Sequence, residues 1–184
     1  DRSRHSCWTA LPIFARILVI TDRTELDEQI ELVFNGVDEE IWRALSSRQL
    51  FAELNTKEKR LLCSLVQKFG RVTNTSGEPT YDIDISELRK NLPTNFSPKG
   101  KIYVFVDECH RSHSGKLHDA MIELLGDATI FIGFTGTPLL KIDKKNTFKV
   151  WGTPIHTYKY DQAVKDGVVL DLRYEARAVE QDIS

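Results

Sequence analysis

The stretch "IYVFVDECHRSHSGK", residues 102–116, is the most informative part of the chain. An apolar run rich in β-branched and aromatic residues leads directly into Asp107 and Glu108. A continuous apolar run of this length is typical of a strand buried on both faces, as in a parallel sheet covered by helices. Because ligands bind beyond the carboxyl ends of such strands, the two acids are predicted to lie at a functional edge of a sheet.

Similar runs occur on both sides of this stretch, at residues 17–20, 61–66 and 129–134. The segments between them follow the spacing of amphipathic helices. After the first run, Thr24 is predicted to cap a helix, with one apolar face made of Leu26, Ile30, Val33 and Phe34. After the central run the buried face is predicted to be Leu117, Met121, Leu124 and Leu125, ending at Gly126-Asp127. Alternating strands and helices predict an α/β fold, a parallel sheet flanked by helices.

Other parts of the chain give weaker signals. Residues 36–60 are charged and moderately amphipathic, with candidate buried positions Ile41, Trp42, Leu45, Leu50 and Leu54. Residues 70–82 hold Gly, Asn, Ser and Pro, which predicts a loop. Near the end, a short helix is predicted to stop at Gly167.

Length and composition limit the class of protein. The 184 residues are 41% apolar and 28% charged, which predicts one globular domain with a sizeable core. A net charge of -2 excludes a generally basic coat for nucleic acid, but not a local basic groove. No apolar run approaches the roughly 20 residues of a membrane span. The three widely spaced cysteines favour reduced thiols and a cytoplasmic location.

The acidic pair has a chemical interpretation and a simpler alternative. Consecutive strand-end side chains point in different directions, so one carboxylate can hold a divalent cation while the other polarises a water. The alternative is a solvated strand end, but an apolar run followed by D-E-C-H favours function. A structural zinc is disfavoured, because Cys109, His110, His113 and His118 cluster in one segment without a distant pair of ligands. Gly115-Lys116 lacks the spacing of a phosphate loop.

A second motif, T-G-T-P at residues 135–138, follows the run 129–134. D-E-C-H followed by T-G-T-P resembles motifs II and III of the superfamily 2 helicases and translocases. More narrowly, the chain resembles the motor portion of the type I restriction enzyme R (restriction) subunit. "VITDRTELDEQ" at 19–29, Gln67-Lys68-Phe69 and "AVKDGVV" at 163–169 match that group in the same order. The resemblance covers about residues 17–175.

The resemblance implies ATP and Mg²⁺ as cofactors, with Asp107 holding Mg²⁺ and Glu108 preparing the hydrolytic water. It implies that His110 couples the nucleotide site to the partner lobe or to the nucleic acid, and that Thr135, Gly136 and Thr137 link the nucleotide state to the grip on DNA. It also implies nucleic-acid contacts at the ends of neighbouring strands, made by Thr21, Asp22, Arg23, Ser64, Gln67 and Lys68. The partners implied are double-stranded DNA and, in the parent system, methylase and specificity subunits, with no membrane.

The resemblance also implies a domain plan, in which part of the expected machinery is missing. Residues 1–16 form an atypical N-terminal segment, 17–150 a first RecA-like motor lobe, and 151–184 a connection toward a second lobe. No glycine-rich phosphate loop precedes Ile17, so the lobe is an incomplete P-loop NTPase. We therefore expect a fragment of an ATP-dependent type I site-specific deoxyribonuclease that by itself neither hydrolyses ATP efficiently nor cuts DNA. The alternatives are another superfamily 2 DNA or RNA helicase, and a degenerate non-catalytic nucleic-acid-binding remnant.

Overall fold

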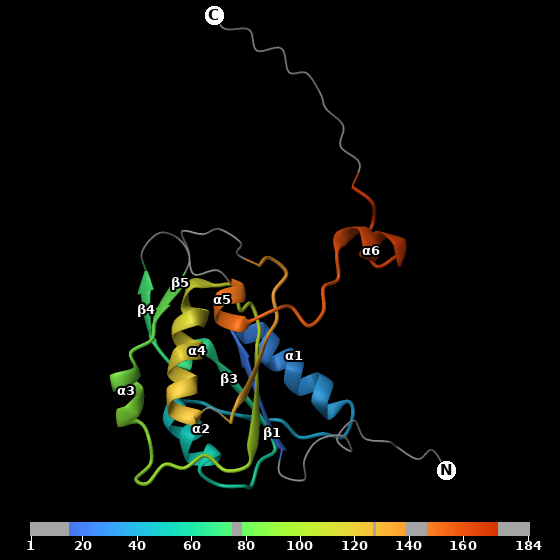
Figure 1. Ribbon diagram of the computed structural model, residues 1–184. Helices are drawn as coiled ribbons and strands as arrows, with labels where there is room; N and C mark the ends of the chain where they lie inside the picture. The colour runs from blue at the N-terminus through green and yellow to red at the C-terminus, as the bar shows by residue number, and fades with distance from the viewer. Residues whose placement is uncertain (1–14, 75–78, 127, 139–146, 173–184) are drawn as a thin grey trace, which may run out of the picture. The chain divides into compact units, whose positions relative to one another are not determined.

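The computed structural model describes residues 15–74, 79–126, 128–138 and 147–172 (Figure 1). For residues 24–28, 71–74, 79–81 and 112–114 it describes the backbone alone. The predicted N-terminal segment up to Phe14 and the predicted approach to a second lobe after Leu172 lie outside the described residues. The chain forms two compact units, Asp1–Gly152 and Thr153–Ser184.

A five-stranded parallel sheet forms the centre of the first unit. The strands run in the order β2-β3-β1-β6-β7, and every neighbouring pair is parallel. Their bounds are β1 Ala15–Thr21, β2 Trp42–Arg43, β3 Leu61–Leu65, β6 Lys101–Val106 and β7 Ile130–Gly133. The predicted α/β fold and its four apolar strands are confirmed. β1 begins at Ala15, ahead of the predicted start at Ile17.

Helices cover both faces of this sheet, as predicted. Helix α1, Thr24–Asn35, lies on one face, and α4, Ser112–Leu125, lies on the other, as Figure 1 shows. The α4 side also receives α2, Ser47–Leu54, and α3, Ile85–Lys90. Apolar side chains from these three helices and from alternate positions of the strands make the larger core cluster.

Helix α1 differs from its prediction at both the start and the buried face. Arg23, and not Thr24, occupies the N-cap position, and no side chain caps the helix. Ile30 and Phe34 pack on the smaller core cluster, but Val33 is 66% exposed. The face of α1 that contacts β1 and β3 therefore includes Ile30 and Phe34 but not Val33. The predicted Leu26 lies outside the described side chains.

Helix α4 follows its prediction. Leu117, Met121, Leu124 and Leu125 are all buried. Gly126 then ends the helix with φ +84°, a conformation that only glycine adopts without strain. His118 on this helix packs its ring against Phe131 of β7 and Trp151, with ring centroids 4.9 Å and 4.8 Å apart. Burial lowers the pKa of His118, which favours the uncharged ring in this aromatic contact.

The segment predicted as a loop at 70–82 is instead an antiparallel hairpin. Its strands are β4, Arg71–Asn74, and β5, Pro79–Asp82. Gly70 permits the close crossing, because a Cβ there would lie 2.6 Å from the carbonyl oxygen of Asp82. The Lys116 ammonium donates to Asp82 Oδ1 at 2.7 Å, which ties the hairpin to α4. Lys116 therefore has a structural partner, in keeping with the absence of a phosphate-loop pattern around it.

Within residues 36–60 most candidate buried positions are confirmed. Ile41, Leu50 and Leu54 are buried and Trp42 is partly buried, whereas Leu45 is 66% exposed. Leu45 immediately precedes Ser46, the N-cap of α2, whose hydroxyl accepts from the Gln49 amide. Leu45 thus lies ahead of α2, whose buried residues are Ser47, Leu50, Phe51 and Leu54.

A buried arginine anchors the start of β1. The guanidinium of Arg16 pairs with Glu53 at 3.0 Å, and both side chains are largely buried. It also donates to four backbone carbonyls at the end of α2 and in the connection to β3, those of Glu53, Leu54, Thr56 and Lys59. Burial lowers the pKa of Arg16 and the charge of Glu53 opposes that shift. This single side chain thus joins the amino end of β1 to the α2–β3 connection.

The second unit contains helix α6, Tyr160–Lys165. Asp166 is its C-cap and Gly167 follows with φ +70°, so the predicted stop at Gly167 is confirmed. The Tyr160 hydroxyl accepts from the Leu172 amide at 2.7 Å and donates to the Leu170 carbonyl at 2.9 Å, which closes the segment after the helix. Across the described ranges of both units, no helix combines the length and the apolar character needed to cross a membrane.

Candidate nucleotide and nucleic-acid site

The carboxyl ends of the parallel strands meet along one edge of the sheet. Here the turn Asp107–His110 follows β6 and is bonded to β1 on one side and to the residue after β7 on the other. The Asp107 amide donates to the carbonyl of Ile20 at 3.0 Å, and the Cys109 amide donates to the carbonyl of Phe134 at 2.9 Å. The two motifs therefore share one rim, as the order of strands in the sequence predicts.

The acidic turn has an unusual backbone at its second residue. Glu108 has φ +48°, the left-handed region that side-chain-bearing residues rarely occupy. Such conformations cost on the order of 1–3 kcal/mol and persist where surrounding contacts impose them. The backbone bonds of Asp107 and Cys109 impose it here, and the Glu108 carboxylate stays partly exposed. Asp107 is partly exposed as well, so both acids are accessible from solvent.

His110 connects the acidic turn to the T-G-T-P loop. Its Nδ1 lies 2.7 Å from Thr135 Oγ1 and 3.2 Å from Glu108 Oε2, and its Nε2 lies 3.3 Å from Thr137 Oγ1. The Thr137 amide also donates to Thr135 Oγ1 at 3.1 Å. Gly136 between the two threonines is exposed, with open space around its Cα. A shift of Glu108 would therefore move the His110 ring and with it the contacts to Thr135 and Thr137.

Cys109 supports the turn from below. Burial, and after it the nearby charges of Glu108 and Asp107, raise the pKa of the Cys109 thiol to about 11. A thiol in this state packs as a small apolar group, whereas a zinc ligand must be a thiolate. In the described part of the chain, no three His, Cys, Asp or Glu side chains gather into a metal-binding group.

Gly133 of β7 leaves the space that Cys109 occupies. A Cβ at this position would lie 2.7 Å from Cys109 Sγ and 2.8 Å from a ring carbon of Trp151. We expect Gly133→Ala to lower the free energy of unfolding by about 1–3 kcal/mol, the usual cost of overpacking. Urea unfolding measures the change.

Gly136→Ala is the matched control, because a Cβ there meets nothing within 4 Å. We expect its effect to stay within about 0.5 kcal/mol. Equal effects of the two substitutions would contradict the close packing of Cys109 beneath the turn.

The predicted nucleic-acid residues lie at the same edge but differ in accessibility. Thr21 and Ser64 are fully buried, and their hydroxyls have no hydrogen-bond partner. The carboxylate of Asp22, 3% exposed, pairs with the guanidinium of Arg111. Arg23 is exposed, and Gln67 and Lys68 in the 3-10 helix η2, Val66–Lys68, are partly exposed. Of the six side chains, only the last three reach the surface, so the other three would act by supporting the strand ends.

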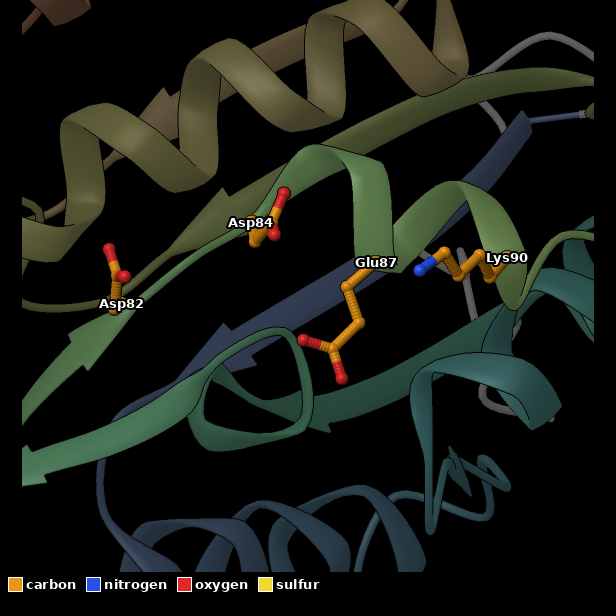
Figure 2. A pocket seen from close by; sticks show the side chains of 4 residues that line it. All are labelled: Asp82, Asp84, Glu87 and Lys90. Carbon is orange, nitrogen blue, oxygen red and sulfur yellow. The ribbon is translucent and has the colours of Figure 1, made fainter.

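A pocket of about 270 Å³ lies away from the acidic turn, at the end of β5 and along α3. Its lining is Asp82, Asp84, Glu87 and Lys90, which Figure 2 shows along the end of β5 and on α3. Asp84 is occupied as the N-cap of α3, where it accepts from the Ser86 amide and hydroxyl, and these bonds lower its pKa. Three carboxylates to one lysine disfavour the binding of a phosphate. The pocket contains none of the residues predicted from the sequence.

Two arginines at the ends of β1 and of the acidic turn were not predicted as functional residues. Arg16 lies in β1, and Arg111 is the N-cap of α4 directly after the D-E-C-H turn. A lone arginine inside an apolar strand is a signal that could have pointed to Arg16. For Arg111 the signal is weaker, because its partner Asp22 is distant in sequence and becomes a neighbour only through the pairing of β1 with β6.

Comparison with known proteins agrees with this geometry. The SWI2/SNF2 ATPase family matches residues 10–184 of the chain. An endonuclease subunit of a type I restriction enzyme from Methanocaldococcus jannaschii is 34% identical over 164 residues, which is 89% of this chain and 14% of that protein.

Two bacterial relatives carry similar names. The type I restriction enzyme endonuclease subunit of Staphylococcus aureus strain MSSA476 is 29% identical over 84% of this chain and 16% of its own length. The type I restriction enzyme HindI endonuclease subunit of Haemophilus influenzae is 28% identical over 86% of this chain and 15% of its own length. The chain thus spans about one seventh of the length of the curated relatives it matches.

Proposed function

Because the chain belongs to the SWI2/SNF2 ATPase family, we propose that it is part of the motor of a type I restriction enzyme. In this proposal Mg-ATP hydrolysis drives movement along duplex DNA, and cleavage belongs to the complete enzyme. The observation that carries the proposal is the contact of His110 with Glu108 on one side and Thr135 and Thr137 on the other. This contact joins the acidic turn 107–110 to the T-G-T-P loop, and a nucleotide-driven motor has to couple these two segments.

The residues of the acidic turn fit Mg²⁺. Magnesium in nucleotide sites takes one or two protein carboxylates, and phosphate and water oxygens complete its shell. Asp107 offers a partly exposed carboxylate at the strand end, which suits this role. When bound, the cation neutralises charge on the phosphates. Glu108 then accepts a proton from the attacking water, and His110 holds the Glu108 carboxylate at 3.2 Å.

Contacts to the DNA backbone suit a protein that moves along DNA, because such contacts carry no sequence information. In the proposal Arg23 binds a phosphate at the end of β1, and Gln67 and Lys68 bind at the end of β3. Thr21, Asp22 and Ser64 shape the backbone that presents them. Residues 17–150 form the first motor lobe and 151–184 lead toward a second one. Methylase and specificity subunits in the cytoplasm complete the enzyme.

Arg23→Ala tests the DNA contact. We expect duplex DNA binding by the chain to weaken equally for unrelated sequences, and the slope of log K against log salt to fall by about 1. The cause is the loss of one phosphate contact and of its released counterion. Fluorescence anisotropy at several salt concentrations measures both quantities.

Lys101→Ala is the matched control. Lys101 is exposed and carries the same charge, but it lies at the amino end of β6, away from the rim. It should leave the slope unchanged. Equal losses of DNA affinity in the two variants would reject the assignment of Arg23 and indicate nonspecific attraction. A salt slope for Arg23→Ala equal to that of wild type would also reject the phosphate contact.

A further inference from the structure

The buried ion pair between Asp22 and Arg111 joins two segments that the proposed function keeps separate. Asp22 lies between Thr21 and the exposed Arg23, at the proposed DNA contact. Arg111 directly follows His110, at the proposed hydrolytic turn. The Asp22 side chain is 3% exposed and that of Arg111 is 27% exposed, so the carboxylate is buried and the guanidinium is partly exposed.

Arg111 is also bonded to the acidic turn through its backbone. Its amide donates to the carbonyl of Glu108 at 3.1 Å. It is the N-cap of α4, and its guanidinium, which can only donate, pairs with the Asp22 carboxylate. A continuous path of contacts therefore runs from Arg23 through Asp22 and Arg111 to Glu108.

Burial makes this path stiff. A carboxylate held away from water is costly unless a cation stays beside it, and losing one partner of a buried pair costs far more than losing an exposed one. Asp22 and Arg111 must therefore move together when either segment moves. By contrast, the exposed pair of Arg89 and Glu123 can separate into water at little cost.

We propose that Asp22 and Arg111 are positioning residues that couple the DNA-contacting segment 21–23 to the hydrolytic turn 107–110. This inference rests on the proposed function for the roles of the two segments. The mechanical link itself concerns only the described contacts. A DNA phosphate that draws Arg23 outward would pull on Arg111 and, through its amide, on the strained backbone of Glu108.

Backbone hydrogen exchange on the whole 184-residue chain tests the link. Arg111→Gln should raise exchange at residues 21–23 by about tenfold, within the range of typical coupling energies. Asp22→Asn should do the same at residues 107–111. The double variant should show no more than the larger single effect, because both changes break one contact. Effects confined to the mutated segment, or effects that add in the double variant, would overturn the proposal.

Glu53→Gln is the matched control for a weakened buried pair. It alters the pair with Arg16 at the other end of β1 and lowers stability without touching Asp22 or Arg111. After correction for the exchange that global unfolding causes, the exchange rate at residues 21–23 should stay close to that of wild type in this variant. A rise as large as that of Arg111→Gln would show that any loss of stability loosens the rim, which would also overturn the proposal.

Duplex DNA affinity separates the positioning role of Asp22 from the effect of its charge, because the two predict changes in opposite directions. Removing an acidic charge near a DNA contact ordinarily strengthens binding to phosphate. If Asp22 positions Arg23, Asp22→Asn should instead weaken binding by about tenfold. Stronger binding would overturn the positioning role. If the wild-type chain binds no DNA, the proposed function fails at that step, and the exchange experiment still decides whether the link exists.

Discussion

Arg16→Ala is expected to lower the free energy of unfolding by about 3–5 kcal/mol, the usual cost of removing one partner from a buried ion pair. The substitution leaves Glu53 without its cation in a site where the side chains are 3% and 12% exposed. It also removes a donor from four backbone carbonyls, of which those of Glu53 and Leu54 keep a bond from another backbone amide. Circular dichroism during urea unfolding measures the change.

Two variants sharpen this test. Arg16→Lys keeps the charge but loses the planar fork that reaches several carbonyls at once, so its effect should fall between wild type and Arg16→Ala. Arg89→Ala removes an arginine from the exposed pair with Glu123 and should cost no more than about 1 kcal/mol. An Arg16→Ala variant as stable as Arg89→Ala would contradict the anchoring role.

Glu108→Gln is expected to lower kcat for Mg-ATP hydrolysis by about 10²–10⁴-fold, the range for loss of a general base. Glutamine keeps the shape and the contact with His110 but cannot accept the proton from water. The measurement uses a chimera in which residues 15–152 replace the matching part of the Staphylococcus aureus relative. The same assay on the 184-residue chain checks the expectation that this chain hydrolyses ATP poorly by itself.

Glu123→Gln is the control for charge. It makes the same change on α4, where Glu123 is 44% exposed and pairs with Arg89, so hydrolysis should stay at the wild-type rate. A Glu108→Gln chimera that hydrolyses ATP like the Glu123→Gln chimera would reject Glu108 as the proton acceptor. Binding of Mg-ADP in both variants separates a loss of chemistry from a loss of nucleotide affinity.

The sheet was predictable because its strands are continuous apolar runs. β1, β3, β6 and β7 all lie where such runs occur, and the carboxyl-end placement of Asp107 and Thr135 follows from parallel pairing. The hairpin at 71–82 was missed because glycine, asparagine and proline usually indicate a loop, and its pairing depends on Gly70 passing against Asp82. β2 was missed because a strand of two residues has no periodicity.

The side-chain partners at the site were harder to predict. The burial of Thr21 and Ser64 follows from the way strands and helices pack around the strand ends, which the run of residues alone does not show. The partners of Arg16 are mostly backbone carbonyls, which every residue has, so no residue type in the sequence indicates them. The pairing of Asp22 with Arg111 spans the distance between two motifs that the sequence presents as separate.

The position of β7 at the border of the sheet has a practical consequence for handling this chain. Among the described residues β7 pairs with β6 alone, and Ile130 at its start is 37% exposed. A strand with one open side offers its amides and carbonyls to any other strand in solution. Concentrated preparations would therefore tend to associate edge to edge, and a charged residue placed at Ile130 would improve their solubility.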